Sequence, residues 1–523
     1  MQEPHVSDPS RGRVLGIETE YGISALGQPV GEELHPMQLS NHVVKAYAAY
    51  ASGPGAGRDA GWDYETESPL RDVRGYEVAR NQAHPDQLTD SDLGMANVIL
   101  TNGARLYVDH AHPEYSSPEV TSARAVVRYD QAGDRVMAIA AEQATQRLGR
   151  PVRLYKNNTD GKGASYGTHE NYLLDRQTPF DRIVSQFTPF LVSRQVVTGA
   201  GRVGIGQASE TAGFQLSQRA DFFEAEVGLE TTLNRPIINT RDEPHADAAR
   251  HRRLHVITGD ANRSEISTYL KVGTAALVLQ MIEAGTLGVG PAGAGLRLLR
   301  AVPAMQQVSH DPSCTALLAL ADGRRMTAVD LQQVYLDACL RWLDGRGADL
   351  PDAQRRENAD LVTRWQEVLD TLRDDPTRLA DRLDWVAKLA LLESYRQRDG
   401  LGWDAAKLSL IDLQYADVSP QRSLYAALVR RGSLQRLLDD AEIEAARTQP
   451  PTDTRAYFRG RVMDKFSADV VAASWDSVIF DVPGRPALQR VPLLDPLRGT
   501  QEQVGELLDR CDDVASLFDA LGR

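Results

Sequence analysis

The stretch Asn102–Val120, NGARLYVDHAHPEYSSPEV, gathers tyrosine, acidic and imidazole side chains within a few residues. It opens with Asn-Gly, a strong turn signal, and continues with an alternating, strand-like run. Alternate side chains of a strand share a face, so we expect Leu106 and Val108 to face the core and Tyr107 and Asp109 to lie opposite. The loop that follows has the composition of a site carried on a rigid scaffold. Taken singly, these residues also fit a polar strand edge with surface histidines.

The composition narrows the class of protein. The chain has 523 residues, 42% hydrophobic and 25% charged, as in soluble globular proteins, and its net charge of −14 argues against a nucleic-acid partner. Its three cysteines are scattered without CxxC spacing, which speaks against a disulfide framework or a zinc ribbon and suits a cytoplasmic location. The N-terminal residues lack an apolar region, and no run approaches about 18 apolar residues, so we expect neither secretion by a standard signal nor a membrane span.

Five strand-like segments carry polar pairs at positions i and i+2, and each pair therefore shares a face. These pairs are Glu18/Glu20, Tyr107/Asp109, His169/Asn171, Glu224/Glu226 and Arg253/His255. If the segments form one antiparallel sheet, the pairs can line a single polar concavity. Carboxylates with histidines favour Mg²⁺ or Mn²⁺ over zinc, and arginines beside such an ion suit phosphate. The combination is typical of a phosphoryl-transfer site.

The absence of other motifs argues against several other classes of enzyme. The sequence has no HExxH helix, and the Gly-Lys-Gly at 161–163 lacks the spacing of a P-loop. The cysteines stand in no nucleophile context. A cysteine hydrolase and a zinc protease are therefore poor interpretations.

The periodicity predicts an α+β fold, with a curved, mainly antiparallel sheet packed on helices. The predicted helices span residues 35–51, 123–148, 180–192, 268–284, 328–344, 356–372, 379–396 and 424–447. We expect a catalytic domain over residues 1–435 and a small C-terminal domain over 436–523, the latter with a helix near 466–472, a strand at 474–480 and a final helix from 501. Residues 52–93 are Gly-rich and then charged, which predicts a mobile insertion that acts as a gate over Asp109.

Long motifs resemble one known family. They are GIETEYGIS (16–24), the opening stretch, LYKNNTDGKGASYGTHENYL (154–173), RPIINTRDEPHAD (235–247), RRLHVITGDAN (252–262), DWVAKLALLESYRQRD (384–399), PPTDTRAYFRG (450–460) and ASWDSVIFD (473–481). They resemble the Pup ligase/deamidase family, which is similar to carboxylate–amine ligases of the glutamine synthetase and glutamate–cysteine ligase class. The resemblance covers nearly the whole chain and implies a glutamine-synthetase-like catalytic domain.

The family has two branches. One ligates Pup, a small disordered protein modifier, to lysines; the other deamidates the C-terminal glutamine of Pup and removes Pup from tagged proteins. VDHAHPEY around Asp109, EVGLETT (226–232) and the long insertion resemble the second branch. This implies ATP- and Mg²⁺-dependent hydrolysis of the Pup C-terminal amide and of the Pup–lysine isopeptide bond, with Pup and pupylated proteins as partners. The alternatives are a Pup ligase and an inert nucleotide-binding module; the intact acidic and imidazole motifs argue against the latter.

The resemblance also assigns roles to residues. Those similar to metal-binding positions are Glu18, Tyr107, Glu114, His169 and His255. Those similar to nucleotide-contacting positions are Gly16, Ile17, Glu18, Thr19, Glu20, Ser116, Ser117, Asn171 and Arg253. Asp109 resembles the catalytic aspartate, as a nucleophile or as a general base.

Five further residues are open to two interpretations. Arg219 and Arg241 fit a contact with phosphate or with the Pup C-terminus, and fit ordinary salt bridges equally well. His110, His112 and His245 are expected to be supporting or surface residues. Hydrolysis of an amide needs no energy from ATP, so the resemblance implies that the nucleotide or its phosphate shapes the site.

Overall fold

The computed structural model describes residues 12–27, 34–52, 60–79, 83, 94–287, 295–346 and 350–522. Its centre is a six-stranded antiparallel sheet in the order β13-β8-β1-β6-β5-β4. The strands are β1 (Leu15–Glu20), β4 (Asn97–Ile99), β5 (Arg105–Asp109), β6 (His112–Ser116), β8 (Thr168–Asp175) and β13 (His251–Val256). The α+β class and the mainly antiparallel sheet are confirmed.

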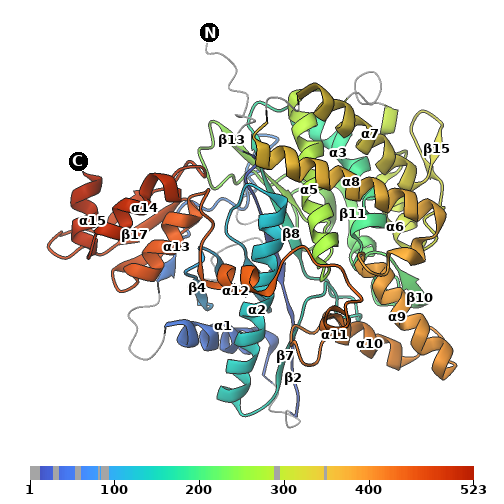
Figure 1. The fold of residues 1–523 in the computed structure, drawn as a ribbon, viewed down its shortest axis with the longest axis horizontal. Coiled ribbons are helices and arrows are strands. Elements are labelled where there is room, and N and C mark those ends of the chain that lie inside the picture. The colour runs from blue at the N-terminus through green and yellow to red at the C-terminus, as the bar shows by residue number, and fades with distance from the viewer. Residues whose placement is uncertain are drawn as a thin grey trace.

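Helices cover one face of this sheet and leave the other to polar side chains. The apolar side chains of β1 join a large buried cluster with α2 (Ala123–Leu148) and α5 (Glu265–Ala284). Leu106 and Val108 of β5 are buried in a second cluster with α1 (Pro36–Ser52) and α2, as the alternation predicts. In Figure 1, helices α3 (Phe180–Ser193), α7 (Ala328–Arg346) and α8 (Asp352–Asp374) stand together with α5 on one side of the molecule.

The remaining elements connect and flank these layers. The helices are α4 (Gln195–Thr198), α6 (Ala301–Ser309), α9 (Asp384–Asp399), α10 (Ala406–Ala416), α11 (Leu424–Arg430), α12 (Asp440–Thr448), α13 (Ala456–Lys465), α14 (Gln501–Arg510) and α15 (Val514–Leu521), with 3-10 turns at Ala220–Phe222 and Pro376–Leu379. The strands are β2 (Gly22–Ala25), β3 (Gly61–Trp62), β7 (Val152–Tyr155), β9 (Arg202–Ile205), β10 (Thr211–Gln215), β11 (Phe223–Gly228), β12 (Arg235–Asn239), β14 (Leu318–Ala319), β15 (Arg325–Met326), β16 (Val470–Ala473), β17 (Ser477–Phe480) and β18 (Gln489–Pro492).

The C-terminal segment supplies most of a third hydrophobic core. A four-stranded sheet in the order β18-β17-β16-β3 packs with α13, α14 and α15 in one buried cluster. Figure 1 shows these three helices at the end of the molecule opposite α7 and α8. The strand β3 and its Trp62 come from the N-terminal half of the chain, so this cluster is not made from the tail alone. The domain boundary at residue 436 stays a prediction.

Two predicted elements are wrong, and one predicted strand lies outside the central sheet. The segment 424–447 is two helices, because Gly432 (φ +69°) lies just beyond α11 and Asp439 starts α12 with a capping box. The expected helix at 466–472 is a turn that leads into the strand β16, and the helix lies earlier, as α13. The pair Glu224/Glu226 lies on β11, which pairs in parallel with β12 outside the central sheet.

The insertion predicted at 52–93 is described in part. Residues 60–79 pack on the body: the Val73 amide donates to the Thr240 carbonyl (2.9 Å), and the Asp242 amide donates to the Arg71 carbonyl (2.8 Å). Residues 53–59, 80–82 and 84–93 lie outside the described residues. Mobility of this segment and its action as a gate stay predictions.

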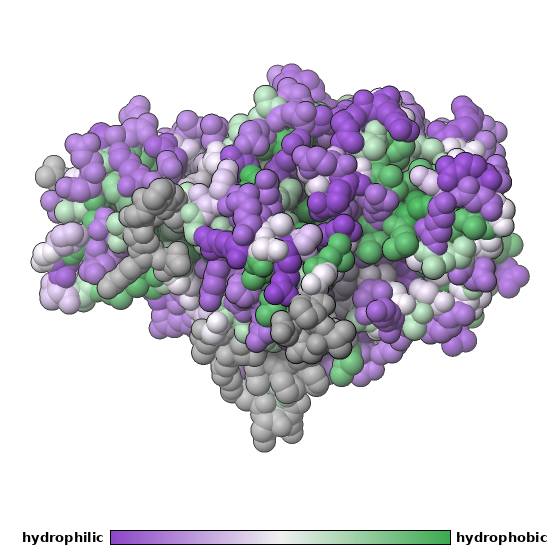
Figure 2. Space-filling view, turned by 90° about the horizontal axis from the view of Figure 1, so that it is seen from below, coloured by the Kyte–Doolittle hydropathy of each residue, from purple (hydrophilic) through white to green (hydrophobic). Residues whose placement is uncertain are grey.

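The surface matches the composition. Figure 2 shows the face seen from below Figure 1, where hydrophilic side chains cover much of the surface and hydrophobic ones gather toward the right side. Within the described part of the chain, no helix combines the length and apolar character that a membrane span requires.

Candidate active site

The register of the central strands brings the predicted residues together. Because antiparallel strands place Cα partners side by side, i and i+2 residues on neighbouring strands form rows on one face. The rows are Gly16–Asn171–His255, His169–Glu18–Ser116–Arg105, Glu20–Glu114–Tyr107 and Asp109–His112. The polar concavity expected from alternation is therefore present, built by the pairs on β1, β5, β8 and β13.

One group of possible metal ligands is Glu18, His169 and His255, whose ligand atoms all lie within 4.8 Å of one another. Burial alone would raise the pKa of Glu18, but the His169 hydrogen bond and the Arg253 charge outweigh it and hold the pKa at about 2. Burial, together with the charge of Arg253, lowers the pKa of His255 well below its ordinary value. An ionised carboxylate and a neutral imidazole are the forms that bind a cation.

A second group is Glu20, Asp109 and Glu114, again with ligand atoms within 4.8 Å. Burial raises the pKa of Glu114 well above its ordinary value, and the charges of Asp109 and Glu18 add to the effect, while a hydrogen bond with Tyr107 opposes it. Carboxylates packed this closely repel one another unless a cation lies between them. The donors of the two groups thus fit divalent cations, with oxygen ligands dominating in the second group.

A backbone amide and a neighbouring imidazole hold the Glu20 carboxylate in place. The Gly167 amide donates to Oε1 of Glu20 (2.6 Å), and Nδ1 of His112 lies 3.3 Å from Oε2. The His112 ring packs on Tyr166, with ring centroids 4.3 Å apart. His112 thus contacts Glu20, and its supporting role stays a prediction.

His110 lies beside the predicted catalytic aspartate. Its Nδ1 is 3.0 Å from Oδ1 of Asp109, and its φ of +50° follows from its place in the two-residue turn between β5 and β6. Both residues line the acidic pocket, which we define by Tyr64, Glu67, Tyr107, Asp109, Glu114, His169, Arg241, Glu243 and His255.

Arginines supply positive charge at the edge of this pocket. Arg253 donates through Nη1 to Oδ1 of Asn171 (2.6 Å) and through Nε to the Glu243 carbonyl (2.8 Å). Asn171 in turn donates to Oε1 of Glu18 (2.9 Å). Arg241 lines the pocket, and its buried Nε has no hydrogen-bond partner among the described residues.

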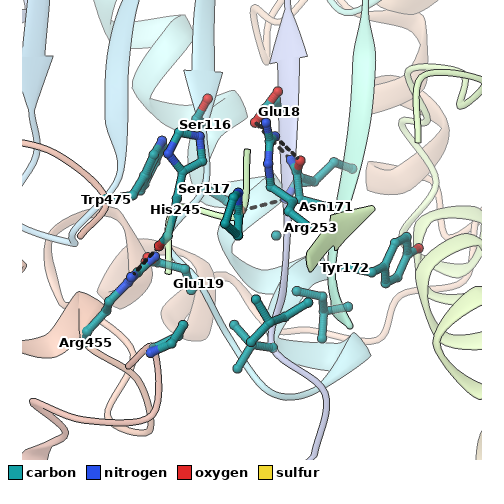
Figure 3. Close-up of a pocket in the computed structure, with 17 residues that line it drawn as sticks. Glu18, Ser116, Ser117, Glu119, Asn171, Tyr172, His245, Arg253, Arg455 and Trp475 are labelled. Carbon is teal, nitrogen blue, oxygen red and sulfur yellow. Dashed lines mark hydrogen bonds and ion pairs between the residues drawn. The ribbon is translucent and has the colours of Figure 1, made fainter. Parts of the chain in front are cut away.

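An apolar pocket adjoins the acidic one. It is lined by Val14, Leu15, Gly16, Ile17, Ser117, Glu119, Tyr172, Leu173, Pro244, Arg455 and Pro496. Glu18, Ser116, His245, Arg253 and Trp475 line both pockets. In Figure 3, Glu18, Asn171 and Arg253 stand together on one side, and Glu119, His245, Arg455 and Trp475 on the other. The two pockets thus form one site with an apolar end and a charged end.

Some predicted residues lie away from these pockets. Thr19 is 1% exposed and points to the helix-covered side of β1. Arg219 is also 1% exposed, lines neither pocket and donates to the Ile257 carbonyl (2.8 Å). Burial, with the charge of Arg235, lowers the pKa of Arg219 to about 9.

Sequence reasoning missed several residues of the site. Arg105 shares a face with Tyr107 and could have been found by the same alternation. Its guanidinium carbon lies 3.9 Å from the Trp62 ring centroid and 3.8 Å from that of Tyr107. Tyr64, Glu67, Arg455 and Trp475 come from the insertion and the C-terminal segment.

Fold and site together define an α+β protein whose sheet presents two groups of possible metal ligands beside an apolar pocket. The chain belongs to the Pup-ligase protein family, whose model matches residues 13–479. It is 59% identical over 511 residues to a depupylase of Acidothermus cellulolyticus, covering 97% of this chain and 99% of the relative. It is 54% identical over 514 residues to a Pup deamidase/depupylase of Mycobacterium tuberculosis, covering 97% and 99%. The structure of the Pup ligase PafA in complex with ADP is similar with a TM-score of 0.71 at 35% identity, covering 83% of this chain and 95% of PafA.

Proposed function

We propose that this protein hydrolyses the C-terminal glutamine amide of Pup and the isopeptide bond between Pup and lysine, with ATP and Mg²⁺ bound at the site. The position of Asp109 carries the proposal: it lies in the acidic pocket, within ligand distance of Glu20 and Glu114. The higher identity to a depupylase and to a deamidase/depupylase than to the ligase PafA favours hydrolysis over ligation.

The chemistry of the site supports this reaction. Hydrolysis breaks the amide C–N bond, places a water oxygen on the carbonyl carbon and releases ammonia or the lysine amine. Asp109 either takes a proton from the attacking water or attacks the carbonyl carbon and is then freed by water. Arg241 and Arg253 place positive charge where negative charge develops. When bound, divalent cations supply further positive charge for the developing oxyanion and for the nucleotide phosphates.

The residues that would hold these groups follow from the geometry. For the cations we propose Glu18, His169 and His255 in one group and Glu20 and Glu114 in the other, with Tyr107 beside Glu114. For the nucleotide we propose the apolar pocket for the base, with the strand residues Gly16–Ile17, Ser116 and Ser117, and Asn171 and Arg253 toward the phosphates. The support for a nucleotide is the ADP bound to PafA and the apolar end of this site.

One assay tests the proposal. The protein is incubated with Pup ending in glutamine, ATP and Mg²⁺, and mass spectrometry follows the amide-to-acid change and the release of Pup from a pupylated protein. Conversion in both is the expected result. Ligation of glutamate-ended Pup to a lysine-containing protein, without deamidation, would instead show a ligase. Nucleotide binding with neither reaction would leave a binding module.

A second measurement separates the two roles of Asp109. A single turnover is run in isotopically labelled water, and the oxygen label is located by peptide mass spectrometry. General-base catalysis places the label in Pup alone. Nucleophilic attack followed by water attack at Asp109 places the label in the aspartate and transfers an unlabelled aspartate oxygen to Pup in that turnover.

A further inference from the structure

The apolar pocket has walls from opposite ends of the chain. One wall consists of the strand residues Gly16 and Ile17 with Ser117, and the other includes Arg455 and Trp475 from the C-terminal segment (Figure 3). The sheet positions the first wall through its backbone ladder. The second wall packs against a different hydrophobic cluster. Other contacts must therefore hold it at a fixed distance from the first wall.

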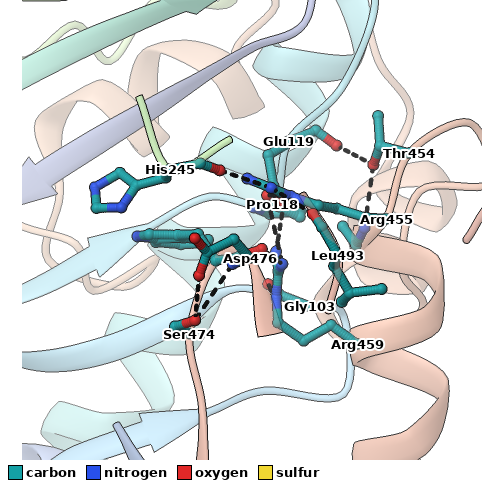
Figure 4. A network of polar contacts seen from close by, with 12 residues as sticks. Gly103, Pro118, Glu119, His245, Thr454, Arg455, Arg459, Ser474, Asp476 and Leu493 are labelled. Carbon is teal, nitrogen blue, oxygen red and sulfur yellow. Dashed lines mark hydrogen bonds and ion pairs between the residues drawn. The ribbon is translucent and has the colours of Figure 1, made fainter. Parts of the chain in front are cut away.

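Glu119 lies at the junction of the two walls. Its Oε1 accepts from Nε of Arg455 (2.7 Å) and its Oε2 accepts from Nη2 of Arg459. Its backbone carbonyl accepts from Oγ1 of Thr454 (2.7 Å). One residue just beyond β6 therefore binds three side chains at the start of α13 (Figure 4).

The two arginines extend these contacts to the residues that face the pocket. Arg455 donates through Nη1 to the carbonyls of His245 (2.7 Å) and Leu493 (2.8 Å). Arg459 donates to the carbonyl of Trp475 (3.1 Å), and its guanidinium carbon lies 4.9 Å from the centroid of the Trp475 ring. His245 and Trp475 both line the site, so their backbone positions depend on cations that share Glu119.

The two buried guanidinium groups depend on the negative charge of Glu119. Arg455 and Arg459 are 3% and 0% exposed, and Glu119 bonds to both. Burial would raise the pKa of Glu119, but the two guanidinium charges hold it at about 2. The carboxylate is thus ionised at neutral pH, and its loss would leave two buried cations without their shared partner.

We infer that Glu119 is a positioning residue for the nucleotide: through Arg455 and Arg459 it sets the place of the C-terminal wall, with His245 and Trp475, against the strand wall of the apolar pocket. The inference rests on the proposed function, because it takes the pocket to hold the nucleotide. If Glu119 has this role, the C-terminal segment contributes to the affinity for the nucleotide. The acidic groups proposed for the chemistry lie on the central sheet.

The test compares Glu119→Gln with Val462→Ala. Val462 is fully buried in the C-terminal cluster and lines neither pocket of the described structure, so its truncation loosens the same cluster without touching the site. For Glu119→Gln we expect KM and Kd for ATP to rise about tenfold or more, because a displaced wall misplaces the base, with kcat at saturating ATP within about twofold. Val462→Ala should lower the melting temperature with unchanged ATP affinity.

Arg455→Lys provides a second variant should Glu119→Gln not fold. It keeps a cation beside Glu119 but loses Nη1, which donates to both carbonyls, and it should also raise KM for ATP selectively. An unchanged KM in Glu119→Gln, or an equal rise in Val462→Ala, would overturn the inference. Absence of ATP binding in the wild-type protein would instead overturn the proposed function.

Discussion

Burial and neighbouring charges favour the protonated form of Glu114, and Glu114→Gln tests this in metal-free protein. The side chain is 2% exposed. Burial and the charges of Asp109 and Glu18 raise its pKa well above the ordinary 4.5. Without a cation, the folded protein therefore keeps a proton on Glu114 at pH values where the unfolded chain has released it.

Linkage fixes the sign and size of the effect. Because the folded-state pKa is raised, the stabilising contribution of the Glu114 proton is complete below pH 4.5 and is lost as the pH rises toward the folded-state pKa. Across that window the wild-type protein should lose about 1.4 kcal/mol of unfolding free energy per pH unit through this group. Glutamine carries no titrating proton, so Glu114→Gln should lack this slope.

The assay is urea unfolding in EDTA at a series of pH values above 4.5, with the free energies of variant and wild type subtracted. The difference should grow with pH in favour of Glu114→Gln. Glu18→Gln is the comparison variant. The pKa of Glu18 is held at about 2, so Glu18 does not itself titrate in this window, but its charge helps to raise the pKa of Glu114; its removal should keep the slope and end it at a lower pH. Parallel profiles for Glu114→Gln and wild type would refute the reasoning.

Mg²⁺ extends the same experiment. A cation bound by carboxylates requires their ionised form and displaces the proton from Glu114. Saturating Mg²⁺ should therefore reduce the slope of the wild-type protein and leave that of Glu114→Gln unchanged.

Three further outcomes are expected. Asp109→Asn should lower turnover by at least about a hundredfold and keep Mg-ATP binding, measured by titration calorimetry; full activity would remove Asp109 from its role. Mg²⁺ at about 100 times its Kd should stabilise the wild-type protein by about 2.7 kcal/mol in unfolding experiments, and His255→Ala should show a smaller gain; equal gains would place the cation elsewhere. Gly167→Ala should reduce kcat about tenfold or more at a nearly unchanged melting temperature, because a Cβ there would lie 2.2 Å from His169 and 2.7 Å from Glu20.

Local signals allowed much of the fold to be predicted. The helix over 123–148 was predicted with its observed ends, because Ser122 caps its first turn and Gly149 (φ +65°) ends it. The helix over 424–447 was wrong because its apolar spacing continues across a break that depends on Gly432 and Asp439. Helix caps involve only one or two residues, so apolar periodicity measured over a long window does not detect them.

Alternation along strands predicted the charged half of the site, since it needs no knowledge of which strands pair. It failed for Glu224 and Glu226, whose strand β11 pairs with β12 outside the central sheet. The pairing partner of a strand is a tertiary property, and alternation alone cannot supply it.

The apolar end of the site could not be predicted from alternation, for a different physical reason. Glu119 and Arg455 are separated by 336 residues, and no periodicity relates them. Aromatic residues such as Trp475 are also ordinary constituents of cores, so a search for acidic, imidazole and guanidinium groups passes over them. Sequence motifs can therefore predict the charged part of such a site but not its apolar part. The half that was not predicted is held in part by the carboxylate of Glu119. Changes in the C-terminal segment can therefore alter affinity through Glu119 while the groups proposed for the chemistry stay unchanged.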